Sequence, residues 1–109
     1  MLTSVGVIAE FNPFHNGHLA LLRQLRCRSQ ADVVVVVMSG DWTQRGEPTI
    51  VDKWLRAKIV LRHGADLVIE LPAQFAVQEA SFFASGAVNL INQLGCDWLG
   101  FGCEHPRLN

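Results

Sequence analysis

The feature that most constrains the fold is the run of five valines and one methionine from Val33 to Met38, which contains no polar residue. Valine is β-branched and favours extended backbone, and a run without polar alternation has no side that suits water. Such a strand needs cover on both faces, as in parallel sheets with helices packed on either side. We therefore predict an α/β fold with this strand at the centre of its sheet.

Further elements alternate along the chain in the same way. Extended segments are predicted over Val5–Ile8, Asp66–Leu71 and Asp97–Gly102. Helices are predicted over His18–Gln30, over Ile50–Arg62 with a capping box of Thr49 and Asp52, and from Gln78 or Glu79 to Leu94. The alternation implies right-handed β-α-β crossovers. We expect a Rossmann-like three-layer sandwich with a parallel sheet, and one nucleotide-binding domain over residues 1–109.

Each predicted helix has an apolar side that should face the sheet. These sides comprise Leu19, Leu22 and Leu25 in the first helix; Ile50, Trp54, Ala57, Ile59 and Leu61 in the second; and Phe82, Phe83, Ala87, Leu90, Ile91 and Leu94 in the third. Arg23, Arg26 and Arg28 lie mostly on other faces, and we interpret them as solvated surface. His63 before Gly64 is interpreted as a surface residue or cation at a helix end.

Composition excludes several classes of protein. Half of the residues are apolar, so the chain is not a disordered tail. The net charge of -1 gives no global attraction to nucleic acid, and any RNA contact must come from a local patch or from another part of a longer protein. Cys27, Cys96 and Cys103 form no Cys-x-x-Cys motif, which indicates reduced thiols and a cytoplasmic location. The amino-terminal segment lacks a basic region and cleavage site, and we expect no signal peptide or membrane span.

The first predicted strand ends at a turn with two histidines around a glycine. Asn12-Pro13 is turn chemistry, and a helix is expected to begin near Asn16. The N–H groups and partial positive charge of a helix start favour a phosphate there. His15 and His18, three residues apart, would offer two N–H donors to one anion, although such a pair can also bind a metal or cap a helix. Gly17 would let a nucleotide approach the backbone.

Three other places could contact a ligand at the carboxyl ends of the strands. Ser39, Gly40, Gln44 and Arg45 lie in a polar loop after the central strand, where Arg45 could fold over a phosphate or pair with Asp41 or Glu47. Glu70 could meet substrate or magnesium, or accept hydrogen bonds from a neighbouring helix start. Gly102 could let a purine or ribose approach closely. No dinucleotide fingerprint or Walker A loop is present, which disfavours a dehydrogenase.

Several segments together resemble the tRNA(Met) cytidine acetate ligase family of the nucleotidyltransferase superfamily. They are Glu10-Phe-Asn-Pro-Phe-His-Asn-Gly-His18, Met38-Ser-Gly-Asp-Trp-Thr-Gln-Arg-Gly-Glu-Pro48, Val51-Asp-Lys-Trp54, Asp66-Leu-Val-Ile-Glu-Leu-Pro72 and Phe101-Gly-Cys-Glu104. The resemblance implies that acetate attacks ATP to give acetyl-adenylate, and that the acetyl group passes to N4 of the wobble cytidine of elongator tRNA(Met). It also implies a longer protein, so we expect an amino-terminal fragment or a shortened relative.

The resulting site prediction centres on the first turn. His15 and His18 are the predicted catalytic residues, with Mg²⁺ carried by ATP and no metal bound by protein side chains. The predicted ATP-binding residues are Ile8, Ala9, Glu10, Phe11, Asn12, Pro13, Phe14, Asn16, Gly17, Leu19, Ala20, Leu21 and Gly102, with Ser39, Gly40, Gln44 and Arg45 as a substrate or phosphate loop. Two other functions stay open: a nucleotidyltransferase acting on a small phosphorylated substrate, and a non-catalytic nucleotide-binding module.

Overall fold

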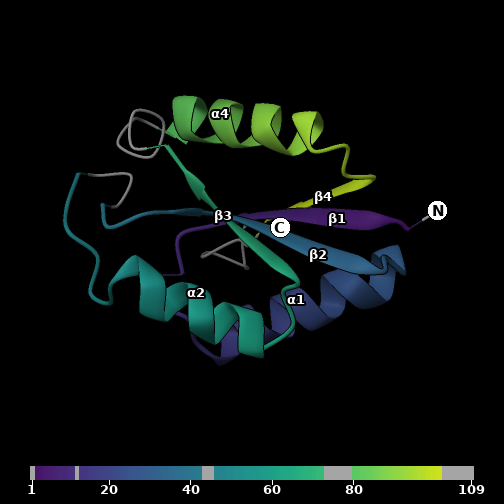
Figure 1. Cartoon of the computed structure of the whole chain (residues 1–109), viewed down its shortest axis with the longest axis horizontal. Coiled ribbons are helices and arrows are strands. Elements are labelled where there is room, and N and C mark those ends of the chain that lie inside the picture. The colour runs from purple at the N-terminus through teal and green to yellow at the C-terminus, as the bar shows by residue number, and fades with distance from the viewer. Residues whose placement is uncertain (1, 12, 43–45, 73–79, 102–109) are drawn as a thin grey trace, which may run out of the picture.

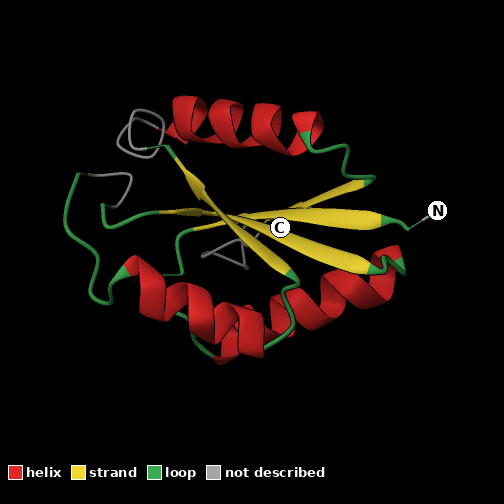
Figure 2. Ribbon diagram, viewed as in Figure 1, coloured by secondary structure: helices red, strands yellow, loops and turns green. Residues whose placement is uncertain are grey.

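The computed structural model describes residues 2–11, 13–42, 46–72 and 80–101 as a sheet with helices on both faces (Figures 1 and 2). The elements are β1 (Ser4–Ala9), α1 (Asn16–Ser29), β2 (Val33–Ser39), α2 (Lys53–Arg62), β3 (Leu67–Leu71), α4 (Ala80–Gln93) and β4 (Trp98–Phe101). The four strands are parallel in the order β3-β2-β1-β4. Helices α1 and α2 cover one face, and α4 covers the other. The predicted α/β fold is confirmed.

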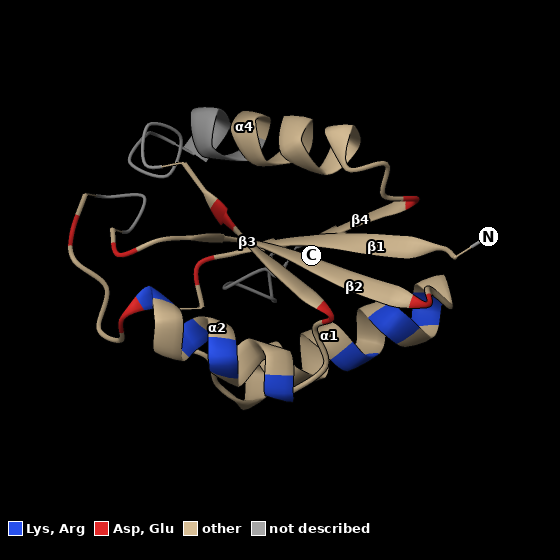
Figure 3. Ribbon diagram, in the orientation of Figure 1, with Lys and Arg blue, Asp and Glu red and all other residues tan. Residues whose placement is uncertain are grey.

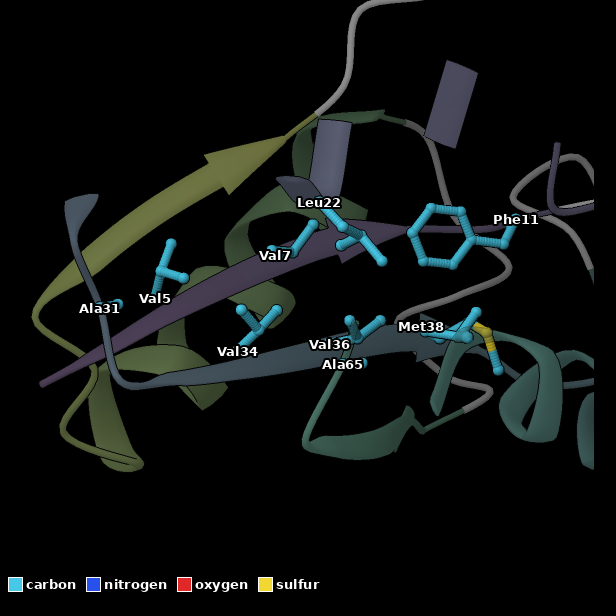
Figure 4. Close-up of a cluster of buried hydrophobic side chains, with 10 residues drawn as sticks. Val5, Val7, Phe11, Leu22, Ala31, Val34, Val36, Met38 and Ala65 are labelled. Carbon is cyan, nitrogen blue, oxygen red and sulfur yellow. The ribbon is translucent and has the colours of Figure 1, made fainter. Parts of the chain in front are cut away.

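The valine run is an interior strand, as predicted. Strand β2 pairs with β1 on one side and with β3 on the other. Its side chains alternate between two apolar clusters. Val34, Val36 and Met38 lie in the cluster beneath α1 and α2, which Figure 4 shows, whereas Val37 lies in the cluster beneath α4. Both faces of β2 are therefore buried, which is why the sequence has no polar alternation there.

Close packing fixes α4 against the sheet. A Cβ atom on Gly6, in the middle of β1, would lie 2.7 Å from Cγ2 of Ile91 in α4. Real side chains do not approach so closely, and so the absence of a side chain at Gly6 lets α4 pack directly on the strand. On the other face, a Cβ on Gly100 of β4 would lie 2.6 Å from Cδ1 of Leu25 in α1. Glycines in the strands therefore let side chains of both helices pack directly against the sheet backbone.

The start of α2 differs from the prediction. The helix begins at Lys53 and not near Ile50, and its N-cap is Asp52, whose carboxylate accepts the Leu55 N–H at 2.8 Å. Thr49 does not cap the helix, because its hydroxyl donates to the Val51 carbonyl at 2.9 Å. Threonine and aspartate both suit an N-cap, and here the aspartate is used.

The buried side of α2 also differs from the prediction. Trp54 is 77% exposed and Leu61 is 46% exposed, whereas Arg56 and Val60 are buried completely. Leu94, predicted on the apolar side of α4, follows the end of that helix and is 42% exposed. The helix is rotated so that the guanidinium of Arg56, and not the indole of Trp54, faces the sheet.

Three aspartates close the amino-terminal edge of the sheet. Each stands one residue before a strand and accepts a backbone N–H at the start of the neighbouring strand or just before it. The bonds run from Thr3 N to Asp32 at 3.0 Å, from Val34 N to Asp66 at 2.8 Å, and from Ser4 N to Asp97 at 2.9 Å. These carboxylates satisfy N–H groups that the parallel ladder leaves open at this edge.

One of the arginines predicted to be solvated takes part in this edge. Arg26 forms an ion pair with Asp66 at 2.7 Å and donates to the carbonyls of Asp32 and Gly64. Burial disfavours the Asp66 carboxylate, but the Val34 N–H and Arg26 outweigh that effect and keep the pKa of Asp66 below its ordinary value. The prediction of a solvated surface is therefore wrong for Arg26, which links α1 to the sheet.

Two predictions on the surface can be compared with the described residues. Cys27 and Cys96 are free thiols, as expected, and Cys103 lies outside the described residues. His63 is the exposed C-cap residue of α2, also as expected. Within the described ranges, no helix combines the length and apolar character needed to cross a membrane.

Candidate functional site

The turn between β1 and α1 is shaped by aromatic packing. Phe11 adopts a left-handed backbone conformation with φ of 51°, and its side chain is buried. Its ring meets Phe14 edge-on, with the centroids 5.1 Å apart, and His18 at 4.7 Å. The left-handed region is unfavourable for a bulky residue, so the surrounding contacts must hold Phe11 in this conformation. The turn is thereby fixed against one side of the His18 ring.

The two histidines cap α1 reciprocally. His15 is the N-cap residue, and its Nδ1 accepts the Gly17 N–H at 3.0 Å. Nδ1 of His18 accepts the His15 N–H at 3.2 Å. The pair thus forms a capping box in which imidazoles replace the usual hydroxyl and carboxylate. The helix-cap interpretation of the histidine pair is confirmed.

This arrangement determines which nitrogen of each ring carries the proton. A neutral imidazole whose Nδ1 accepts a hydrogen bond must be protonated at Nε2. The rings of His15 and His18 are stacked, with centroids 3.7 Å apart and planes inclined by 25°. The cap therefore leaves one Nε2–H donor on each of the two stacked rings.

Gly17 is required by the ring beside it. A Cβ atom at this position would lie 2.9 Å from Cε1 and 3.1 Å from Nδ1 of His15. Any other residue would therefore push the His15 ring from its place over the first turn. The glycine between the histidines keeps their stacked geometry, in addition to the close nucleotide approach predicted from the sequence.

Arg56 is a residue of this edge that the sequence analysis missed. Its side chain is completely buried. Nε donates to the backbone carbonyl of Val51 at 2.9 Å. Nη1 donates to the backbone carbonyls of Glu10 at 2.6 Å and Ser39 at 3.1 Å, and Nη2 donates to that of Gly40. One guanidinium thus joins the end of β1, the end of β2 and the segment before α2.

Negative charges near Arg56 partly offset the cost of burying its guanidinium. Burial lowers the pKa of the guanidinium, while the negative charges of Asp41 and Glu10 oppose that change. Arginine stays protonated in proteins because its ordinary pKa is so high. The sequence offered one sign that Arg56 is buried: it stands four residues before Val60, which puts both side chains on the same side of α2.

The predicted phosphate loop is described only in part. Ser39 is buried, and its hydroxyl oxygen has no hydrogen-bond partner among the described residues. Gly40 is packed against the Glu70 side chain so closely that a Cβ atom would collide with the carboxylate. Gln44 and Arg45 lie outside the described residues, as do Asn12 and Gly102. The two interpretations of Arg45 therefore stay predictions.

Glu70 is engaged by the first residue of α2. Its carboxylate accepts from Lys53 Nζ at 2.9 Å, and this hydrogen bond raises the pKa of Lys53. One sequence-based alternative was that Glu70 accepts hydrogen bonds from a neighbouring helix start. The donor at this helix start is the Lys53 side chain and not a backbone N–H. The first backbone N–H of α2, that of Lys53, is instead accepted by Asp41 at 3.0 Å.

The remaining predicted residues divide between the turn and the core. Pro13 and Phe14 lie in the turn, and Asn16 is the exposed first residue of α1. Ile8, Ala9 and Leu21 contribute to the apolar clusters, Leu19 is half-buried and Ala20 is exposed. No group of three His, Cys, Asp or Glu side chains is placed to bind a metal ion in the described part of the chain.

A family model and solved structures match this fold. The model of the HIGH Nucleotidyl Transferase family matches residues 2–109. The crystal structure of Thermotoga maritima TmcAL bound with alpha-thio ATP is 48% identical, with a TM-score of 0.84 over 87% of this chain and 23% of that one. The apo form of the same protein gives 49% identity and a TM-score of 0.83.

Curated relatives agree with these matches. The tRNA(Met) cytidine acetate ligase of Lactiplantibacillus plantarum is 56% identical over 99% of this chain, and that of Limosilactobacillus reuteri is 58% identical over 97%. The chain spans only 28% of the length of each. The match confirms the resemblance predicted from the histidine turn and the strand-end motifs. The chain belongs to the HIGH nucleotidyl transferase family, and its relatives there include tRNA(Met) cytidine acetate ligases.

Proposed function

We propose that this chain supplies the ATP site for activation of acetate and its transfer to N4 of the wobble cytidine of elongator tRNA(Met). The observation that carries the proposal is the reciprocal cap, which leaves an Nε2–H donor on each of two stacked imidazoles, His15 and His18, at a helix start. The Thermotoga maritima relative bound with alpha-thio ATP supports a nucleotide as the ligand.

In the proposed first step, a carboxylate oxygen of acetate attacks the α-phosphorus of ATP. The bond from that phosphorus to the bridging oxygen of the β-phosphate breaks, and pyrophosphate leaves with the electron pair. Negative charge increases on the non-bridging α-phosphate oxygens in the transition state. Nε2–H donors already aimed at that charge lower the barrier, and losing one such donor typically costs about 3 kcal/mol.

The cap also explains how backbone charge reaches the phosphate. The N–H groups of His15 and Gly17 are used by the imidazoles and do not face a ligand directly. Each donates to Nδ1, and so polarises the ring and strengthens its Nε2–H as a donor. The histidines therefore extend the positive end of α1 outward from the backbone.

In the proposed second step, the N4 amine of the cytidine attacks the acetyl carbonyl carbon. The bond to the oxygen shared with AMP breaks, AMP leaves with that electron pair, and the amine loses a proton. We propose that Mg²⁺ is carried by the ATP phosphates.

Calorimetric titration with ATP is the first test. We expect wild-type chain to bind ATP, and the double variant His15→Ala/His18→Ala to lose binding. The matched control is His63→Ala, which removes an exposed imidazole that also packs on Phe14, with centroids 5.6 Å apart, but takes no part in the cap. Equal loss in the control, or retained binding in the double variant, would place the nucleotide elsewhere.

Pyrophosphate exchange into ATP then tests the acetate step. Exchange should require acetate and both histidines. Exchange that is indifferent to acetate but requires a small phosphorylated compound would favour the other nucleotidyltransferase function. ATP binding with no exchange under any of these conditions would favour the non-catalytic module.

A further inference from the structure

The charges of this chain are separated in space. Helices α1 and α2 contain seven of the nine Lys and Arg residues and none of the ten Asp and Glu residues. Helix α4 has no charged residue. Because α1 and α2 lie on the same side of the sheet, this side is basic although the whole chain has a net charge of -1 (Figure 3).

Three of the seven cations have partners within the fold. Arg56 is buried among carbonyls, Arg26 pairs with Asp66, and Lys53 pairs with Glu70. The other four are exposed and have no ion pair or hydrogen bond with the described part of the chain: Arg23, Arg28, Lys58 and Arg62. These four cations can therefore meet an outside anion.

Helix stability explains only part of this pattern. Arg28 and Arg62 lie in the last turns of their helices, where a cation interacts favourably with the dipole. Arg23 and Lys58 lie further from the helix ends and gain little from it. Lys58 and Arg62 are four residues apart, where like charges repel, and a glutamate in place of Lys58 would instead pair with Arg62. The arrangement favours binding of an anion over stability of the helices.

An exposed indole extends the same row on α2. Trp54, Lys58 and Arg62 are spaced by four residues and lie along one side of the helix. Trp54 is 77% exposed, and Lys53 Nζ lies 5.4 Å from its ring centroid. An exposed aromatic ring among cations can stack on an unpaired base while the cations neutralise phosphates.

We propose that the basic face, defined by Arg23, Arg28, Trp54, Lys58 and Arg62, binds the phosphate backbone of RNA, with an unpaired base stacked on Trp54. The proposal rests on the proposed function only for the identity of that RNA as tRNA(Met). Both helices begin at the carboxyl edge of the sheet, where His15 caps α1. RNA bound along this face would extend toward the candidate nucleotide site.

A membrane surface fits this face less well than RNA does. A helix lying on a membrane buries a broad apolar side among the lipid headgroups. The exposed residues in the second half of α1 are instead mainly polar and basic: Arg23, Gln24, Cys27 and Arg28. On α2 the exposed apolar side chains of Trp54, Leu55 and Leu61 lie among the cations Lys58 and Arg62. Basic side chains with an exposed indole match a phosphate backbone with unpaired bases.

The test uses fluorescein-labelled tRNA(Met) transcript and fluorescence anisotropy at several salt concentrations. In the variant Arg23→Gln/Arg28→Gln/Lys58→Gln/Arg62→Gln, we expect affinity to fall by at least roughly tenfold at low salt, and the slope of log affinity against log salt to decrease by about 3 to 4. The matched control is Arg23→Lys/Arg28→Lys/Lys58→Arg/Arg62→Lys, which keeps all four charges and should keep both affinity and slope.

Trp54→Ala tests the stacking component. It should weaken binding of the transcript by roughly fivefold or more and leave binding of a fully paired RNA duplex unchanged. Wild-type affinity in the glutamine variant would overturn the proposed face. So would loss of binding to phosphatidylglycerol vesicles in that variant with no change in RNA binding, which would assign the face to a membrane.

Calorimetry separates this proposal from the proposed function. The glutamine variant changes no residue of the histidine turn, and we expect its affinity for ATP to equal that of the wild type. Absence of ATP binding in the wild type would contradict the proposed function. The RNA titrations would still show whether the basic face binds RNA. Loss of both RNA binding and ATP binding in the glutamine variant would contradict the assignment of RNA to a surface separate from the histidine turn.

Discussion

The two edges of this sheet are closed by groups of opposite charge. At the amino-terminal edge, carboxylates accept backbone N–H groups, as Asp66 does from Val34. At the carboxyl-terminal edge, the guanidinium of Arg56 donates to backbone carbonyls. Parallel strands leave N–H groups open at one end and C=O groups at the other, and buried or half-buried polar groups need partners. The direction of the strands therefore determines whether a carboxylate or a guanidinium bonds the backbone groups at the strand ends.

The edges also differ in how many segments each group joins. Each aspartate at the amino edge accepts an N–H from one neighbouring strand or from the residue just before it. Two of the three, Asp32 and Asp97, accept from the segment that begins β1. Arg56 alone joins three chain segments at the carboxyl edge, from inside the molecule.

The largest effect is expected from Arg56→Met. The substitution keeps a long side chain but leaves buried carbonyls without a donor, and each such group costs about 1 to 3 kcal/mol. We expect the free energy of unfolding to fall by at least about 3 kcal/mol in urea denaturation. The matched change at the other edge is Arg26→Met, whose side chain is 38% exposed and should cost about 1 kcal/mol. Equal losses of unfolding free energy in the two variants would contradict a greater structural role for Arg56 than for Arg26.

His15→Asn separates the cap from the donor. Asparagine is a good N-cap residue, so the free energy of unfolding should change by less than about 0.5 kcal/mol. It cannot reproduce the Nε2–H beside His18, and acetate-dependent pyrophosphate exchange should slow by roughly 100-fold. At the amino edge, Asp97→Asn should lower stability by about 1 kcal/mol and leave exchange unchanged. Full exchange activity in His15→Asn would limit the histidine to capping.

Local patterns in the sequence were sufficient to predict the fold and the turn between β1 and α1 that carries the two histidines. The valine run requires cover on both faces, and the histidine turn follows the first strand, so both features are visible within a few residues. The alternation of strands and helices then restricts the topology to a parallel sheet. The reciprocal cap was left as one alternative among three, because phosphate binding, metal binding and capping all use closely spaced histidines.

The role of Arg56 could not be predicted because its partners are distant in the sequence. Its acceptors lie at Glu10, Ser39, Gly40 and Val51, and they converge only when the strands have paired. A pattern of apolar residues puts Trp54 inside and Arg56 outside, and the four carbonyls reverse that choice. The aspartate before each of three strands was a visible repeat, but it has meaning only when neighbouring parallel strands are aligned.

Asp66→Asn tests the amino edge through its pH dependence. The pKa of Asp66 is lowered on folding, so its carboxylate contributes stability that is fully present above the ordinary value of 3.8 and is lost as the pH falls through the folded value. The side chain is 47% exposed, and the variant should lose about 1 kcal/mol at pH 7. Urea denaturation at pH 7 and near pH 2 should show the difference from wild type shrinking. A difference independent of pH would contradict a role for the carboxylate charge.

Gly17→Ala should have the smallest effect on stability, and it tests the carboxyl edge most finely. Alanine favours a helix over glycine by about 1 kcal/mol, so propensity alone predicts equal or greater stability. The added Cβ would lie 2.9 Å from Cε1 of His15, however, and the ring must move to avoid it. We expect unchanged stability within about 1 kcal/mol in urea, with ATP affinity reduced several-fold by calorimetry. A variant that is more stable and binds ATP as well as wild type would show that the stacked position of His15 is not needed for the nucleotide, and the orientation of the two donors would no longer explain why a glycine stands between them.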